Sequence, residues 1–284
     1  MIDRSSGLSA GPGHRGGSTF VLARLARSRV VGLRRIPDQS TAELDAGAAA
    51  PVPRAGLFHT GRPTDLRTPK PWHRLAYIIK ALPAGLEDLA GDLGVSADGR
   101  LLDYGCADQP YRRLFPPSVA YVGADLPGNP LASVRIQVDG RIPEPDGSFD
   151  AVLSTQVLEH VEDPTVYLDE CFRLLRPGGR LLLSTHGIMV YHPDPVDYWR
   201  WTGAGLQRIV RQAGFEIERF EGIMGLAASG LQLCQDAVYW HLPRTLRPVL
   251  AFGVQTMIAL ADRAQKPASR RHNALVFALV ARKP

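Results

Sequence analysis

The sequence has few cysteines and no long hydrophobic run. Its three cysteines, Cys106, Cys171 and Cys234, are widely spaced among 284 residues, so they predict neither a disulfide framework nor a zinc site. The longest apolar run near the C-terminus, 248–261, has 14 residues, whereas a helix needs about 20 to span a bilayer. The N-terminus lacks the apolar core and cleavage site of a secretion signal. We therefore expect a cytoplasmic protein without a membrane-spanning segment.

Charge is unevenly distributed along the chain. Residues 1–70 hold 11 Lys/Arg against 5 Asp/Glu, residues 71–240 hold 14 against 22, and residues 241–284 hold 8 against 1. An acidic middle between two basic ends predicts anionic partners for the ends, unless the excess serves solubility alone. The basic ends do not interleave with aromatic residues, as a surface for single-stranded nucleic acid does. No nucleic-acid partner is expected.

Residues 1–68 are rich in Gly, Ala, Pro and Ser and poor in bulky apolar side chains, which predicts a basic, disordered tail. The arginine-rich stretch 19–37 within it also fits a basic amphipathic helix on a membrane surface. From Trp72 a helical pattern runs to Pro83, where we expect it to end. Short apolar runs and helical segments then alternate, which predicts a parallel sheet covered by helices on both faces. The runs lie at 100–104, 120–125, 134–139, 149–154 and 180–185.

The first of these strands is expected to end in the loop "DYGCADQ" (103–109), at the edge of the sheet where ligands bind. Gly105 allows a tight turn, but the other two glycines of a dinucleotide fingerprint are absent, and Asp108 would repel a phosphate. Acids also end the next two strands. Asp125 is placed where a carboxylate can accept both hydroxyls of a ribose, and Asp139 where it can meet an adenine edge. This trio predicts a cofactor with an adenosine but no phosphate and disfavours a nicotinamide oxidoreductase.

Four stretches occur in the order and spacing of a known family: "LLDYGCADQPYRRLF", "YVGADLP", "DGSFDAVLSTQVLEHVEDPTVYLDECFRLLRPGGRLLLST" and "GLQRIVRQAGF". They resemble the motifs of class I S-adenosylmethionine-dependent methyltransferases, specifically the type 11 methyltransferase domain, over residues 97–222. The resemblance implies S-adenosylmethionine as cofactor. It also implies a Rossmann-like seven-stranded α/β fold within a domain at 69–284, whose last strand, 273–282, is antiparallel. Residues 226–266 predict a helical insertion before that strand: a lid, a dimer surface or a lipid contact.

The resemblance also assigns cofactor-binding residues by position. The methionine end of the cofactor is expected against Asp103, Gly105, Cys106 and Ala107, the ribose and adenine against Asp125, Leu126, Asp139 and Gly140, and the sulfonium beside Ser154, Thr155 and Gln156. The family usually has glycine where Ala107 and Gln109 stand. A related subgroup shares Pro110-Tyr111, which leaves Ala107 as the unusual residue. An alanine is tolerable there if its φ angle is negative, so we expect a competent, altered cofactor loop.

Methyl transfer from a sulfonium needs an aligned acceptor and, for a hydroxyl, a base. The candidate bases are His186, after the fifth strand, and His160, which we expect to shape the site more than to take a proton. The segment "YHPDPVDYWRWT" (191–202) is expected to contact the acceptor through Tyr191, His192, Tyr198 and Arg200. A metal site made of His192, Asp194 and Asp197 is the alternative, but a loop in which Asp197 pairs with Arg200 is favoured.

The residues after the fourth strand, 154–157, read Ser-Thr-Gln-Val, unlike the Asn/Asp-Pro-Pro-aromatic motif of enzymes that methylate base amino groups. We therefore predict O-methylation of a small-molecule or glycan-type acceptor. Methylation of nitrogen or carbon, on a small molecule or a lipid-linked acceptor, stays open. So does a non-catalytic binding protein whose cofactor site Ala107 has weakened. The basic ends and the insertion add two expectations, peripheral contact with a membrane and a homodimer.

Overall fold

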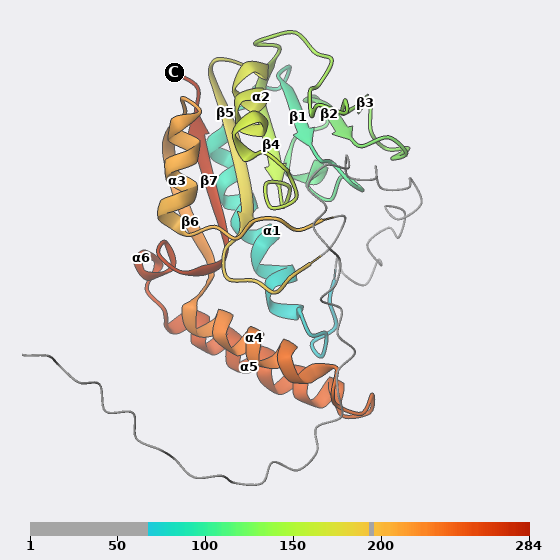
Figure 1. Cartoon of the computed structure of the whole chain (residues 1–284), viewed down its shortest axis with the longest axis vertical. Helices are drawn as coiled ribbons and strands as arrows, with labels where there is room; N and C mark the ends of the chain where they lie inside the picture. The colour runs from blue at the N-terminus through green and yellow to red at the C-terminus, as the bar shows by residue number, and fades with distance from the viewer. Residues whose placement is uncertain (1–67, 193–195) are drawn as a thin grey trace, which may run out of the picture. The chain divides into compact units, whose positions relative to one another are not determined.

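The structure is a computed structural model and describes residues 68–192 and 196–284. Its described part holds a seven-stranded sheet of order β3-β2-β1-β4-β5-β7-β6 (Figure 1). The strands are β1 (Arg100–Tyr104), β2 (Ala120–Asp125), β3 (Val134–Arg135), β4 (Phe149–Thr155), β5 (Leu175–His186), β6 (Glu216–Gly225) and β7 (Ala274–Arg282). The predictions for residues 1–67, a disordered tail and an amphipathic helix at 19–37, lie outside the described residues.

The strand directions confirm the predicted Rossmann-like fold. β1 pairs in parallel with β2 and β4, and β2–β3 and β4–β5 are also parallel. β7 runs antiparallel to both β5 and β6. The chain moves from β1 outward through β2 and β3 and then returns to the other side of β1, so the strand order reverses between β1 and β4. Ligands bind at such a reversal, outside the carboxyl ends of the strands.

Two elements differ from expectation. β3 covers only Val134–Arg135, although the apolar run predicted a strand through residue 139. The chain turns there instead, and the N–H of Gln137 donates to the carbonyl of Arg141 at 2.9 Å. Helix α1 (Ala76–Ala90) continues through Pro83. Proline costs about 3 kcal/mol inside a helix, but Leu86 and Leu89 beyond it are fully buried, and each such side chain contributes about 1.5–3 kcal/mol.

The remaining α-helices are α2 (Pro164–Leu174), α3 (Gly203–Gln212), α4 (Leu226–Tyr239), α5 (Arg247–Ala264) and α6 (Pro267–Arg270). Asp163 caps the N-terminus of α2, because its carboxylate accepts the N–H groups of Thr165 (2.8 Å) and Val166 (3.3 Å), and Pro164 takes the first helical position. α4 and α5 fall within the predicted insertion before β7. No helix of the described residues is long and apolar enough to cross a membrane.

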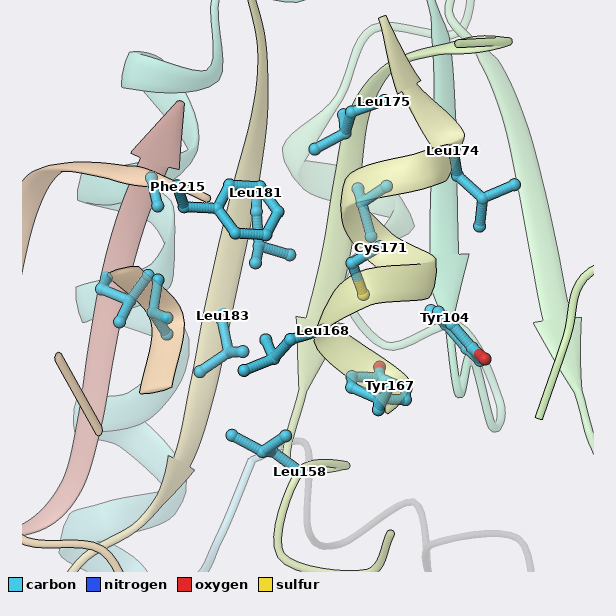
Figure 2. Close-up of a cluster of buried hydrophobic side chains, with 14 of the residues drawn as sticks. Tyr104, Leu158, Tyr167, Leu168, Cys171, Leu174, Leu175, Leu181, Leu183 and Phe215 are labelled. Atoms are coloured by element: carbon cyan, nitrogen blue, oxygen red, sulfur yellow. The ribbon is translucent and has the colours of Figure 1, made fainter. Parts of the chain in front are cut away.

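Alternate side chains of each strand point to opposite faces of the sheet, and each face is covered. On β5, Leu181 and Leu183 belong to one buried cluster and Leu182 to another. Figure 2 shows the first cluster, where Leu168 of α2 lies beside Leu183 of β5. The second cluster contains buried residues of α1, α4 and α5. This two-sided burial fixes the register and therefore the positions of the strand ends.

α4 and α5 lie side by side (Figure 1) and are joined by polar contacts to Arg74, to Tyr77 of α1 and to Gly225 of β6. The carbonyl oxygen of Arg74 accepts hydrogen bonds from the amides of Gln232 (3.1 Å), Gln235 (2.6 Å) and Gln255 (2.8 Å). The buried carboxylate of Asp262 accepts the N–H of Gly225 at 2.8 Å and the hydroxyl of Tyr77 at 2.6 Å. The two helices are thus tied into the domain by specific hydrogen bonds.

Replacement of Asp262 tests this attachment. Asp262→Ala leaves the Gly225 N–H and the Tyr77 hydroxyl without their acceptor in a buried site, and each lost partner costs about 1–3 kcal/mol. We expect the free energy of unfolding in urea to fall by about 2–4 kcal/mol. Asp98→Ala, which changes an exposed acid in a turn, should change it by less than about 0.5 kcal/mol. Equal effects of the two variants would contradict the assignment.

Candidate active site

A cavity of about 1160 Å³ opens at the carboxyl ends of β1, β2 and β4, beside the first turns of α2. Ten of the residues predicted from the sequence line it: Gly105, Ala107, Asp125, Leu126, Asp139, Gly140, Thr155, Gln156, His160 and His192. Seven others do not: Asp103, Cys106, Ser154, His186, Tyr191, Tyr198 and Arg200. The reversal of strand order therefore brings most of the expected residues to one cavity.

The loop after β1 keeps a glycine-like backbone at positions where glycine is missing. Gly105 has a φ of 83°, and a Cβ there would lie 2.5 Å from Cγ2 of Val157. Ala107 and Gln109 have φ angles of 44° and 52°. The condition set from the sequence, a negative φ at Ala107, is therefore not met. Each non-glycine residue in this region costs about 1–2 kcal/mol, so the loop is formed under local strain.

The carboxylate of Asp125 offsets part of this strain. One of its oxygens accepts the N–H of Ala107 at 2.9 Å and the side-chain amide of Asn129 at 2.6 Å, and the other accepts the N–H of Leu126 at 2.7 Å. A carboxylate has about four acceptor positions, so three of them are already used. One position stays for a ligand hydroxyl, and a second hydroxyl would have to displace the Asn129 amide.

Asp103 and Cys106 are buried behind the loop rather than exposed to the cavity. The Asp103 carboxylate accepts the hydroxyl of Tyr121, and burial raises the pKa of Asp103 to about 7. Burial also raises the pKa of the Cys106 thiol to about 12. Cys106 is therefore a neutral thiol at physiological pH, which disfavours it as a nucleophile.

Residues in the turn after β3 and at the end of β4 line the cavity or lie behind its lining. The N–H of Gln156 donates to the carbonyl of Ser184 at 2.8 Å, and the Gln156 side chain donates to the Ser184 hydroxyl at 3.0 Å. Ser154 is fully buried and accepts the hydroxyl of Tyr167 at 2.8 Å. Asp139 accepts the N–H of Arg141 at 3.1 Å. Gly140, whose φ is 82°, has open space where a Cβ would stand.

These residues fit S-adenosylmethionine by their chemistry. Asp125 offers an acceptor position for a ribose hydroxyl, and Leu126, Ile136 and Val157 supply apolar surface for an adenine in the same cavity. Gly140 leaves backbone open to close approach, and Gly105 lets Val157 pack against the loop after β1. The cavity also has Asp108 in its lining, which suits a cofactor without phosphates.

Two of the predicted residues, His160 and His186, lie around a buried acid, Glu159. Oε1 of Glu159 is 3.1 Å from Nε2 of His186 and 3.9 Å from Nε2 of His160, and Oε2 accepts the hydroxyl of Thr185 at 2.8 Å. Burial raises the pKa of Glu159 to about 7 and lowers that of His186 to about 3. His186 is 2% exposed and is therefore a neutral, enclosed imidazole at physiological pH.

His160 differs from His186 because it lines the cavity. Its Nδ1 lies 2.6 Å from the carbonyl of Val196. Since a carbonyl only accepts, Nδ1 carries the proton in the neutral ring. Nε2 is then an unprotonated acceptor that can take a proton.

The segment 196–201 crosses beside these residues and is fixed by the backbone. The carbonyl of Glu159 accepts the N–H groups of Tyr198 (2.8 Å) and Trp199 (3.2 Å), and the carbonyl of His186 accepts that of Trp201 (3.0 Å). Arg200 uses all five of its N–H donors on Asp197 and on the carbonyls of Met189, Val190 and Trp199. The predicted Asp197–Arg200 pair is present, and Arg200 holds the loop rather than offering donors to an acceptor.

The other members of this segment are placed differently. His192 lines the cavity, and its backbone N–H donates to Asp197 at 2.8 Å. Tyr191 and Tyr198 are 68% and 49% exposed and lie outside the lining. Within 68–192 and 196–284, no three His, Cys, Asp or Glu side chains are arranged to hold a metal ion; Asp194 lies outside the described residues.

Sequence reasoning did not single out Asn129 or Glu159. Asn129 accepts the N–H of Leu131 at 2.9 Å and donates to both Asp125 and the carbonyl of Ala107. Its place four residues after the strand-end acid, in a Gly-Asn-Pro turn, was the available signal. For Glu159 the signal was its position between the apolar Leu158 and the candidate base His160.

Comparison with known proteins agrees with this geometry. A family described as a methyltransferase domain matches residues 72–219, just over half of the chain. The chain belongs to this family. The resemblance to class I S-adenosylmethionine-dependent methyltransferases is thereby confirmed, together with S-adenosylmethionine as the cofactor of the family.

Curated relatives match a smaller part of the methyltransferase chain. It is 35% identical over 112 residues to a probable S-adenosylmethionine-dependent methyltransferase of Mycolicibacterium smegmatis, covering 37% of this chain and 42% of that protein. It is 36% identical over 135 residues to the ubiquinone biosynthesis O-methyltransferase of Xanthomonas oryzae pv. oryzae, covering 41% and 52%. The chain thus spans about half the length of these relatives. A solved geranyl diphosphate methyltransferase is 14% identical with a TM-score of 0.48, covering 74% of this chain and 82% of that one.

The strain at Ala107 can be measured. Ala107→Gly removes a left-handed penalty of about 1–2 kcal/mol and adds about 0.4–1 kcal/mol of unfolded-state entropy. We therefore expect the free energy of unfolding to stay equal or to rise by up to about 1 kcal/mol. Ala237→Gly, at an exposed position of α4, should lower it by about 1 kcal/mol. If both variants lose the same stability, the positive φ at Ala107 is not strained.

The pKa of Asp103 predicts a pH dependence. Unfolded aspartate binds its proton only below a pH of about 4, whereas folded Asp103 binds it below about 7. As the pH falls from 7 to 4, the folded state takes up this proton and is stabilised by about 1 kcal/mol per unit. Relative to Asp103→Asn, the parent should therefore gain stability on acidification in urea titrations. A difference that stays constant between pH 7 and 5 would contradict the raised pKa.

Proposed function

We propose that the chain transfers the methyl group of S-adenosylmethionine to a hydroxyl oxygen of a small-molecule acceptor, with His160 as the base. The observation that carries the proposal is the position of His160. It lines the cavity next to Gln156 and Val157, and the Val196 carbonyl fixes its tautomer. A hydroxyl is a poor nucleophile until its proton is shared, so an O-methyltransferase gains most from such a base.

Different residues of the chain orient the cofactor, border the acceptor region and accept the proton. Asp125 and Leu126 orient the cofactor, whose sulfonium supplies the electrophilic methyl group. Gln156, held by Ser184, borders the region between cofactor and acceptor. His160 accepts the hydroxyl proton at Nε2, and the carboxylate form of Glu159, 3.9 Å from that atom, stabilises the resulting imidazolium. The fixed backbone of segment 196–201 holds His160 in place.

His186 was the first candidate for the base in the sequence, and its enclosure makes His160 the better choice. A ring that is 2% exposed has no access to an acceptor in the cavity. Its lowered pKa also makes it a weak proton acceptor, because proton transfer works best when the pKa lies near the working pH. We assign His186 to the support of Glu159.

Two observations support a hydroxyl-bearing small molecule as the acceptor. The relative from Xanthomonas oryzae pv. oryzae is named an O-methyltransferase, and this chain shares a third of its residues with the matched region. Val161 and Val166 also line the cavity beside His160, which suits an acceptor with apolar surface around its hydroxyl. A glycan-type acceptor, more polar, is the second candidate on the sequence argument.

The test measures S-adenosylhomocysteine release with a set of phenols, sugar alcohols and amines. We expect turnover with a hydroxyl acceptor, and His160→Ala should lower it by about 10²–10⁴-fold with S-adenosylmethionine affinity nearly unchanged in calorimetry. His272 is an exposed histidine near β7, so the control variant His272→Ala should have the turnover and cofactor affinity of the parent. Turnover restricted to amines would overturn the assignment of O-methylation. Full activity of His160→Ala would contradict the assignment of His160 as the base. Absence of cofactor binding in the parent would favour the non-catalytic alternative.

A further inference from the structure

The α4–α5 pair buries many polar side chains and exposes large apolar ones, while Ala228, Ala251 and Ile258 are its buried apolar residues. Three of the four buried residues of α4 are polar, and so are two of the four buried residues of α5: Ser229, Gln232, Gln235, Gln255 and Asp262. Large apolar side chains of the same pair and its connection are exposed to 46–70%: Leu226, Val238, Trp240, Leu246, Val249, Phe252, Met257 and Leu260. Soluble helices have the opposite arrangement.

The exposed apolar residues of α5 form a continuous stripe. Val249, Phe252, Met257 and Leu260 follow helical spacing, and they are 70%, 55%, 53% and 61% exposed. Between them the same face carries Gly253 and Thr256, so it holds no charge from 249 to 260. An exposed apolar stripe of this kind marks a contact with an apolar partner.

The charges around the stripe are almost all positive. Arg244 and Arg247 precede it, and Arg263 and Lys266 follow it. The two acids of the pair point inward, where Asp236 pairs with Arg74 at 3.0 Å and Asp262 with Arg270 at 3.4 Å. Arg247 also lies over the rings of Tyr239 and Trp240, at 5.6 and 5.1 Å. The stripe therefore has basic residues and aromatic rings at its border and no exposed acid.

We propose that the outer face of α4 and α5 binds the surface of an anionic phospholipid membrane. A bilayer interface offers apolar acyl chains with anionic phosphates above them, which matches a stripe bordered by arginines and lysine. A second copy of the chain fits less well, because a two-fold contact would place the same basic residues against one another. The proposal rests on this surface alone and not on the methyl acceptor.

Cys234 supplies a native position for the measurement. It is exposed on α4, whereas Cys106 and Cys171 are buried, so a thiol-reactive, polarity-sensitive fluorophore labels the full-length protein there. With vesicles of phosphatidylglycerol and phosphatidylcholine, we expect a blue shift and co-sedimentation at low salt. Both should weaken steeply at physiological salt. Vesicles of phosphatidylcholine alone should give little binding.

Three variants separate this surface from the basic N-terminal residues. The triple variant Val249→Ser, Phe252→Ser, Leu260→Ser should lower the partition coefficient at least tenfold. Arg263→Gln should lower it about fivefold, the effect of one basic residue near an anionic surface. Arg208→Gln, the same charge change at an exposed position of α3, should change it by less than twofold. Thermal unfolding of each variant checks that the fold persists, and Phe252→Ser alone serves if the triple variant unfolds.

The results of these experiments distinguish a membrane from a second copy of the chain as the partner of the outer face of α4 and α5. Loss of binding and of the blue shift in the stripe variants, with Arg208→Gln unaffected, supports the membrane. Vesicle binding that is unchanged in the triple variant overturns the proposal and assigns binding to another basic part of the chain. A dimer in light scattering that the triple variant abolishes, together with no vesicle binding by the parent, also overturns it in favour of a second copy.

Discussion

The carboxylate of Asp125 holds the cavity in shape because it joins the loop after β1 to the loop after β2. β1 and β2 are parallel neighbours with Tyr104 opposite Ala124, so both loops leave the same edge of the sheet. The N–H of Ala107 and the amide of Asn129 meet on one oxygen. This charge-assisted contact keeps the strained backbone at Ala107 in its glycine-like form. Asp125 is therefore a structural residue before any ligand binds, and a preorganised acceptor afterwards.

The layout of the site could be predicted from the sequence because strand ends in a parallel sheet share an edge. Asp125 ends β2 and Gln156 follows β4, and the reversal of strand order collects them in one cavity. Asp139 lines the same cavity from the turn after β3, although the strand predicted through it ends at Arg135. The φ of Ala107 could not be predicted, because it depends on contacts of Asp125, Asn129 and the next loop. Local sequence shows which residues leave a strand but not how the backbone is held after it.

The enclosure of His186 escaped prediction for a related reason. A strand-end residue is open only if nothing crosses it, and here segment 196–201 passes over β5 with the Trp201 N–H on the His186 carbonyl. That segment lies ten residues or more along the chain, and its hydrogen bonds to Glu159 and His186 are long-range. Glu159 is consequently a fully buried carboxyl beside two imidazoles, with its pKa raised to about 7. Carboxyl groups whose pKa is raised by burial are found more often at functional sites than elsewhere.

The polar interior of α4 and α5 explains how these helices can expose an apolar face without losing their place. Helices usually dock by burying apolar stripes, and such packing would compete with any apolar partner for the same side chains. Here three glutamine amides converge on the carbonyl of Arg74, and Asp262 binds Gly225 and Tyr77. Since these bonds orient the pair, and Ala228 and Ile258 supply its apolar contact with the second cluster, Phe252 and Leu260 are not needed for docking. The directional bonds inside therefore leave the outer face available for a second, apolar contact.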